Sequence, residues 1–104
     1  MSLRNEWYVY HQNNPQVYQL ICHFAGQAMR AGHSKYGISA IWERVRWEIA
    51  VTTRDTNFKM PNNHRAYYAR LWLENHPHHP KFFRTAVLRS ERPNRPVDRY
   101  GRAL

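Results

Sequence analysis

The residues best suited to binding chemistry lie together between positions 62 and 70. Their side chains can donate or accept hydrogen bonds: Asn62, Asn63, His64, Arg65, Tyr67 and Arg70. We predict a helix over 63–75, whose free N–H groups and positive dipole end would suit a phosphate. Its core stripe is predicted to be Ala66, Ala69, Trp72 and Leu73, and the residues predicted to face the other way are Asn63, Tyr67, Arg70 and Glu74. Asn can bond bidentately to adenine and Arg to guanine, so the cluster predicts binding to nucleic acid or to a partner protein. The alternative is that one Asn caps the helix while the tyrosines pack inside.

A second group of candidate binding residues comprises Arg44, Arg46 and Trp47. Trp47 lies away from the main apolar face of a helix predicted over 40–50. That face carries Ile38, Ile41, Trp42, Val45 and Ile49. An exposed Trp beside Arg suits stacking on a base or a hot spot for a protein partner. We favour the alternative, in which Trp47 packs against the aromatic N-terminal segment. Glu43 and Glu48, which lie among these arginines, are predicted to form ion pairs.

The charge balance points to an anionic partner. Sixteen Lys and Arg residues oppose seven Asp and Glu residues, which gives a formal net charge of +9. Most of the basic residues are Arg, whose planar guanidinium suits phosphate, carboxylate and guanine. The excess favours nucleic acid, DNA more than RNA, or an acidic host protein. A generic basic surface would have the same composition.

Residues 90–104 alternate Arg and Pro with polar residues and lack the periodicity of a core-forming element. We predict that they form a flexible C-terminal tail. Arg89, Arg92 and Arg95 are candidates for tracking phosphates or entering a minor groove. The alternative is a solvated terminus with no fixed role.

The sequence offers little support for catalysis or metal binding. His76, His78 and His79 cluster around a proline, but the pattern lacks the further ligands that a zinc site needs. No carboxylate pair suits Mg²⁺, and no Gly-rich phosphate loop is present. We therefore predict no enzyme activity, no metal and no cofactor. The single Cys22 excludes an internal disulfide, and no apolar run approaches the ~20 residues of a membrane span, which favours the cytoplasm.

The predicted elements are mostly helical. Apolar periodicity indicates helices over 15–31, 40–50 and 63–75, the first opened by Asn14-Pro15 and closed by Gly32, and the second capped by Ser39. The aromatic segment 1–12 is predicted to be a short strand or a strap on the core. A small hairpin over 51–60 and a strand over 82–88 complete the set.

These elements predict a mostly α fold with a small β element. We expect one compact three-helix, winged-helix-like domain over 1–89, followed by the tail. In a helix-turn-helix domain with a wing, the last helix of the trio enters the major groove, which would make helix 63–75 the recognition element. About twelve residues separate the second and third helices, whereas three or four are usual.

Three segments resemble an uncharacterised group of small phage- and prophage-encoded proteins. They are residues 14–18 (NPQVY), 39–47 (SAIWERVRW) and 58–70 (FKMPNNHRAYYAR), and the similarity covers roughly residues 8–84. The resemblance implies a viral or mobile-element origin and carries no catalytic residues over. The sequence thus predicts a basic, phage-associated DNA-binding protein of the host cytoplasm. The alternative is an anti-defence inhibitor or adaptor that binds a host protein through the same basic, aromatic face.

Overall fold

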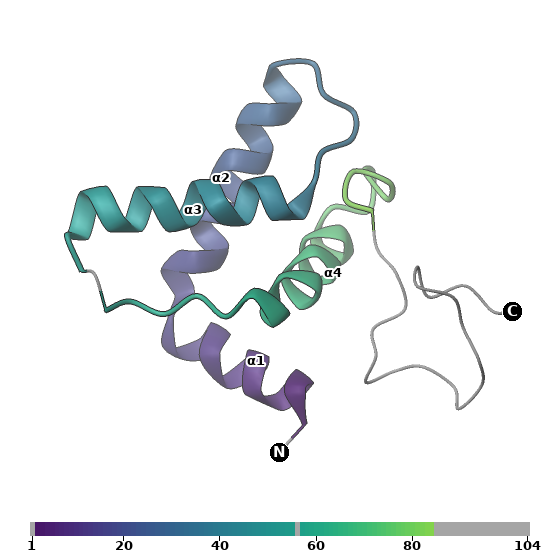
Figure 1. Cartoon of the computed structure of the whole chain (residues 1–104). Coiled ribbons are helices and arrows are strands. Elements are labelled where there is room, and N and C mark those ends of the chain that lie inside the picture. The colour runs from purple at the N-terminus through teal and green to yellow at the C-terminus, as the bar shows by residue number, and fades with distance from the viewer. Residues whose placement is uncertain (1, 56, 85–104) are drawn as a thin grey trace, which may run out of the picture.

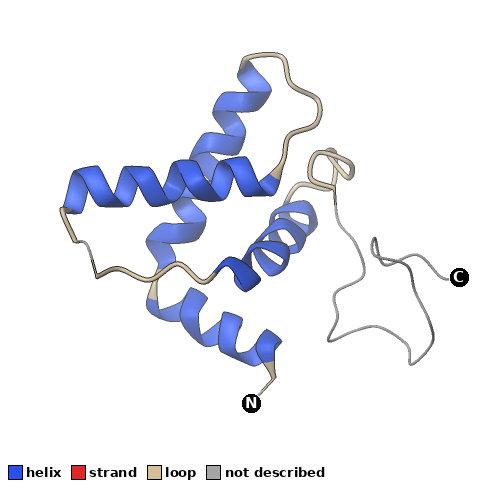
Figure 2. Cartoon of the chain, in the orientation of Figure 1, coloured by secondary structure: helices blue, strands red, loops and turns tan. Residues whose placement is uncertain are grey.

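Helices that cross one another enclose an aromatic core (Figure 1). The computed structural model describes residues 2–55 and 57–84. The helices are α1 (Leu3–Asn13), α2 (Pro15–Arg30), α3 (Ile38–Thr53) and α4 (Arg65–Asn75), and the short 3₁₀ helix η1 (Asn62–His64) leads into α4. Within the described residues there is no strand (Figure 2), so the predicted small β element and wing are not found there. The described chain is a compact all-α globule.

The N-terminal segment is the helix α1, so the predicted strand over 1–12 is wrong. Ser2 caps the helix, because its hydroxyl accepts a hydrogen bond from the Asn5 N–H at 3.1 Å. Trp7 is buried, and Leu3 and Tyr10 pack partly against the core. These positions repeat every three to four residues, which is the period of a helix. The helix ends before Pro15, since a residue that precedes proline disfavours helical geometry.

Helix α2 confirms the prediction for 15–31 to within one residue. Pro15 occupies the first turn, where its missing N–H costs nothing. At the other end Gly32 adopts a φ of +99°, a conformation that suits glycine. The N–H of Gly32 bonds to Met29 O at 3.0 Å and that of His33 to Ala28 O at 3.1 Å. This paired pattern is a Schellman motif, which ends the helix as predicted.

Helix α3 is longer than predicted, and the hairpin over 51–60 is not formed. The hydroxyls of Thr52 and Thr53 donate to the carbonyls of Glu48 (2.7 Å) and Ile49 (2.6 Å), so these β-branched residues continue the helix. Gly37, and not Ser39, is the N-cap residue. Residues 57–61 run back along α3 without helix or strand and enter η1 (Figure 1).

Phe82 and Phe83 are buried but do not form the predicted strand. Their rings lie 4.9 Å and 5.1 Å from that of Trp72 on α4, so they close the core from a loop. His76 ends α4 and stacks on the same Trp72 at 3.9 Å. The rest of the predicted strand, 85–88, lies outside the described residues.

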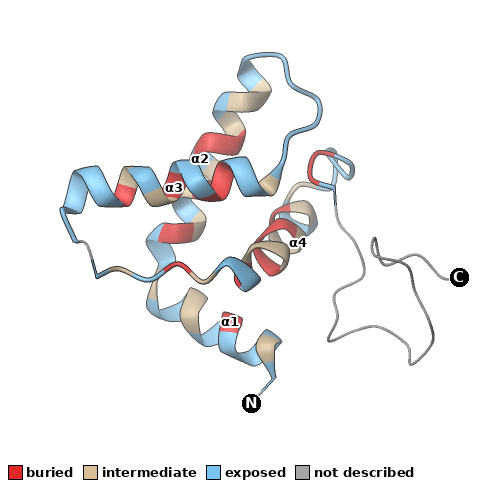
Figure 3. Ribbon diagram, in the orientation of Figure 1, coloured by how far each residue is buried: buried red, intermediate tan, exposed pale blue. Residues whose placement is uncertain are grey.

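The core consists of large aromatic side chains joined by aliphatic residues from α2 and α3. Trp42 is fully buried, as the helical spacing predicts. Figure 3 shows buried positions in all four labelled helices. The largest fully buried side chains are those of Trp42, Trp72, Tyr68, Phe82, Phe83, Ile21, Val17 and Val45. Such packing holds the helices in fixed relative positions, and with them the surface residues discussed next.

Candidate functional site

Two of the predicted binding residues, Asn62 and Arg46, bond to each other and to the protein itself. The Asn62 Oδ1 accepts hydrogen bonds from Trp42 Nε1 at 3.1 Å and from Arg46 Nη2 at 2.7 Å. The same Arg46 nitrogen donates to Met60 O at 3.0 Å, while Nη1 pairs with Glu43. These bonds fasten the segment before η1 to helix α3. Their evident role is to hold the start of α4 in place.

We predict that Asn62→Ala lowers the free energy of unfolding by about 1–3 kcal/mol, because Trp42 Nε1 would lose its acceptor. Urea denaturation followed by circular dichroism measures the change. Asn63→Ala, at the exposed neighbouring position, is the matched control and should change stability by less than about 0.5 kcal/mol. Equal denaturation midpoints for the two variants would show that the bond contributes nothing.

His64 and Tyr67 are buried, so the predicted outward orientation of Tyr67 is wrong. The Tyr67 ring stacks on Trp7 of α1 at 5.5 Å, and the His64 ring meets Tyr10 edge-on at 5.1 Å. Burial lowers the pKa of His64, which favours the neutral ring. The exposed face of α4 differs from the predicted one because the N-terminal segment is the helix α1. Helix α1 covers the side of α4 that carries Tyr67. Ala66 and Leu73, which are predicted to be core, are only half-buried.

Arg70 is half-buried on α4 and lines a small groove where α1 meets α4. The groove has a volume of about 100 Å³ and also includes Arg4, Trp7 and Glu74. Arg70 has interactions of its own within the protein. Its predicted contact with nucleic acid stays a prediction.

Trp47 is exposed, so its predicted packing against the N-terminal segment is wrong. Just over half of its surface, 56%, faces solvent. The Arg44 guanidinium lies 4.5 Å from the Trp47 ring centre and 4.6 Å from that of Phe24 on α2. Arg44 also pairs with Glu48 at 3.1 Å, which together with the Arg46–Glu43 pair confirms the predicted ion pairs. Helix α3 thus presents a cation held on aromatic rings.

A cationic surface forms where the amino ends of α3 and α4 approach the loop after α4. One groove, of about 310 Å³, includes Ser39, Asn63, Arg65 and Arg84. A second groove, of about 560 Å³, includes Lys35, Lys81 and the same Arg84. Among the described residues, no acidic side chain lines either groove. We call Lys35, Arg65, Lys81 and Arg84 the cationic surface.

The sequence prediction found only Arg65 of this surface. Lys35 lies in the α2–α3 loop and Lys81 and Arg84 lie after α4, so nothing local in the sequence marks them as neighbours. The loops are held together by a hydrogen bond from the Tyr36 N–H to Phe82 O at 2.9 Å. The predicted tail residues Arg89, Arg92 and Arg95 lie outside the described residues, and their role stays a prediction.

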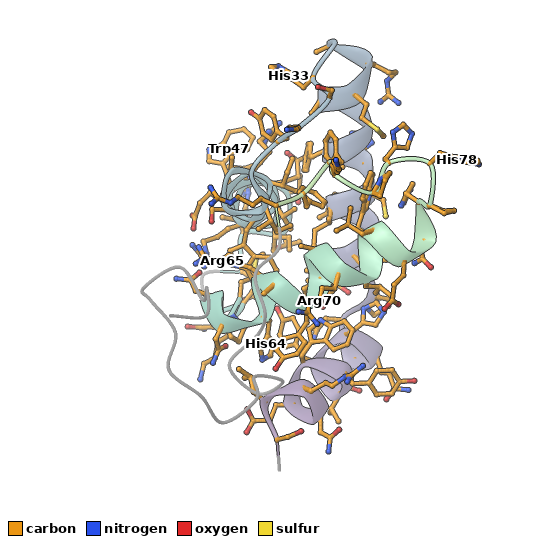
Figure 4. All side chains as sticks on the ribbon, turned by 90° about the vertical axis from the view of Figure 1, so that its right-hand side faces the viewer. His33, Trp47, His64, Arg65, Arg70 and His78 are labelled. Carbon is orange, nitrogen blue, oxygen red and sulfur yellow. The ribbon has the colours of Figure 1, made fainter. Side chains whose placement is uncertain are left out.

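The histidines of the described chain do not converge. Figure 4 shows His33, His64 and His78 in separate parts of the molecule, with His78 at the opposite end of α4 from Arg65. Within residues 2–55 and 57–84, no group of three or more His, Cys, Asp or Glu residues is placed to hold a metal ion. In the same residues, no helix has the length and apolar character needed to cross a membrane.

Comparisons with known proteins add no relative. No protein family, curated protein or solved structure matches the chain.

Proposed function

We propose that this protein binds nucleic acid, and that the cationic surface holds its phosphates. The observation that carries the proposal is the convergence of Lys35, Arg65, Lys81 and Arg84 around two adjoining grooves without a carboxylate. Within the described residues, no ion pair engages any of these side chains. Their charge is therefore available to an external anion, and phosphate contacts dominate the affinity of nucleic-acid binding.

The distribution of charge over the described residues supports this choice of surface. The α3 arginines, Arg44 and Arg46, are paired with Glu48 and Glu43, so each contributes little net charge. Arg65 and Arg84 line their shared groove beside Asn63. Arg suits the planar, bidentate recognition of phosphate, and Asn63 adds an amide that could bond to a base or a sugar.

Helix α4 enters the proposal through its amino end. Asn63 and Arg65 lie at this end of the helix, whereas Tyr67 and Trp72, further along, are part of the core. We therefore propose contact through the start of α4, in place of a helix lying with a full face in a major groove. The phage association, the cytoplasmic site of action and the preference for DNA over RNA are parts of the same proposal.

A second candidate function is the binding of an acidic host protein by an inhibitor or adaptor. The observation that favours it is the exposure of Trp47 and Val51, one turn apart on α3. Exposed Trp beside Arg is typical of protein hot spots. Capture from host lysate with and without nuclease treatment separates a directly bound protein from one that is bridged by nucleic acid.

The proposed function is tested by titrating labelled DNA oligonucleotides with the purified protein at about 50–200 mM salt. We expect binding that weakens steeply with salt, because each phosphate contact contributes a slope of about −0.9 on duplex DNA and about −0.7 on a single strand. Contacts from all members of the cationic surface predict a slope of about −3 to −4. Folded protein that binds neither form of DNA nor RNA at about 50 mM salt would overturn the proposal and favour the protein partner.

A further inference from the structure

An aromatic groove lies between α2 and α3, beside the α2–α3 loop. It has a volume of about 390 Å³ and includes Phe24, Gln27, His33, Tyr36 and Arg44. His33 and Tyr36 meet edge-on at 5.2 Å. The volume is within the range of small-molecule sites, so a flat ring has room to enter.

The Arg44 side chain extends this groove onto the surface of α3. Its guanidinium lies against both Phe24 and Trp47, and Trp47 leaves more than half of its surface to solvent. Planar side chains from the loop and from α3 therefore surround one groove, and the buried Phe24 of α2 lies against Arg44 within it. Trp, Tyr and Arg planes are the usual platforms for unpaired bases.

The aromatic groove and the cationic surface adjoin each other through the loop. Tyr36 lines the aromatic groove, and its neighbour Lys35 lines the groove that holds Lys81 and Arg84. The loop is fixed by the bond from Tyr36 to Phe82 O. The rings can stack on bases, and the cations, which form no ion pair within the described residues, can bind the phosphates of the same strand.

Building on the proposed function, we infer that the nucleic acid bound here is single-stranded. Its phosphates lie on the cationic surface, and its bases stack on Trp47 and enter the groove beside Tyr36 and Arg44. A duplex keeps its base faces stacked on one another, so it would contact the cations and leave the aromatic groove unused. The net charge of +9 attracts a strand of any sequence, because every strand supplies phosphates.

The test uses the fluorescence of Trp47. The other tryptophans, Trp7, Trp42 and Trp72, are at most 8% exposed, so a stacking base can reach Trp47 with little effect on them. At about 50 mM salt, we expect oligo-dT to quench the emission and to bind at least about tenfold more tightly than a duplex of equal length. Trp47→Phe should abolish the quenching while circular dichroism stays unchanged.

A second variant gives the energetic effect. Trp47→Ala should weaken oligo-dT binding by about 5- to 100-fold, the loss expected for one stacked base. Tyr8→Ala, which removes an aromatic ring that is 52% exposed on α1, is the matched control and should leave the affinity unchanged. Equal affinity for duplex and single strand, or an unaffected Trp47→Ala variant, would overturn this inference and leave the proposed function in place. Folded protein that binds neither form of DNA nor RNA would overturn both.

Discussion

Trp42→Ala is expected to lower the free energy of unfolding by about 3–5 kcal/mol, the cost usually measured when a buried aromatic side chain is truncated to alanine. Trp42 is fully buried, and its ring centre lies 5.6 Å from that of Tyr68. Its Nε1 donates to Asn62, so the substitution also removes one of the bonds that fasten the start of α4. A domain of this size has about 5–15 kcal/mol of stability in total, so a large fraction would be lost.

Chemical denaturation followed by far-ultraviolet circular dichroism measures the effect. Trp47→Ala, five residues along the same helix, is the matched control, because Trp47 is mostly exposed. It should change the free energy of unfolding by about 0.5 kcal/mol or less. If both alanine variants unfold at the same denaturant concentration, Trp42 does not have the central place in the core that the structure gives it.

The sequence predicted those parts of the fold in which particular residues mark where an element begins or ends. Helix α2 is marked by Pro15 at one end and by Gly32 at the other, and each acts through its own backbone geometry. Helix α3 was predicted by its apolar face, but its last turn was missed because Thr52 and Thr53 favour strands elsewhere. Their hydroxyls bond to carbonyls one turn back, an option that composition alone does not reveal.

The exposed face of α4 differs from the predicted one because the first twelve residues contain a helix. Trp7, Tyr8 and Tyr10 are residue types that favour strands, so the first twelve residues were not expected to be helical. Once α1 is a helix, Trp7 projects onto α4 and buries Tyr67, which would otherwise have faced solvent. Tertiary contact between segments sixty residues apart decided which side of α4 is exposed.

The residues of the candidate site are also far apart in the sequence, and only tertiary packing brings them together. Arg65 could be proposed from the cluster at 62–70, but Lys35, Lys81 and Arg84 become its neighbours only through the packing of two loops. The exposed position of Trp47 depends on where the N-terminal segment goes, and α1 packs against α4 instead of α3. Composition predicts an anionic partner, and only the fold shows which cations of the described residues have no carboxylate beside them.

Removal of charge from the cationic surface should therefore weaken binding much more than the same loss of charge elsewhere. In the triple variant Arg65→Gln, Lys81→Gln and Arg84→Gln, three phosphate contacts are lost. The salt slope on oligo-dT should become shallower by about 2, since each contact to a single strand contributes about 0.7. At about 0.1 M salt the affinity should fall by about 100-fold. The measurement is fluorescence anisotropy of labelled oligo-dT at several salt concentrations.

The matched control replaces Arg30, Arg54 and Lys59 with Gln. These residues are exposed and line neither of the two cationic grooves. Their substitution removes the same number of Arg and Lys charges as the first triple variant. Because the Debye length is about 10 Å at 0.1 M salt, distant charges contribute little to a contact, so the control should keep most of the affinity and of the salt slope. If both triple variants lose affinity equally, the protein attracts nucleic acid by its overall charge, and the cationic surface is not the binding site. If only the first variant loses affinity, the convergence of α3, α4 and the two loops places the phosphates.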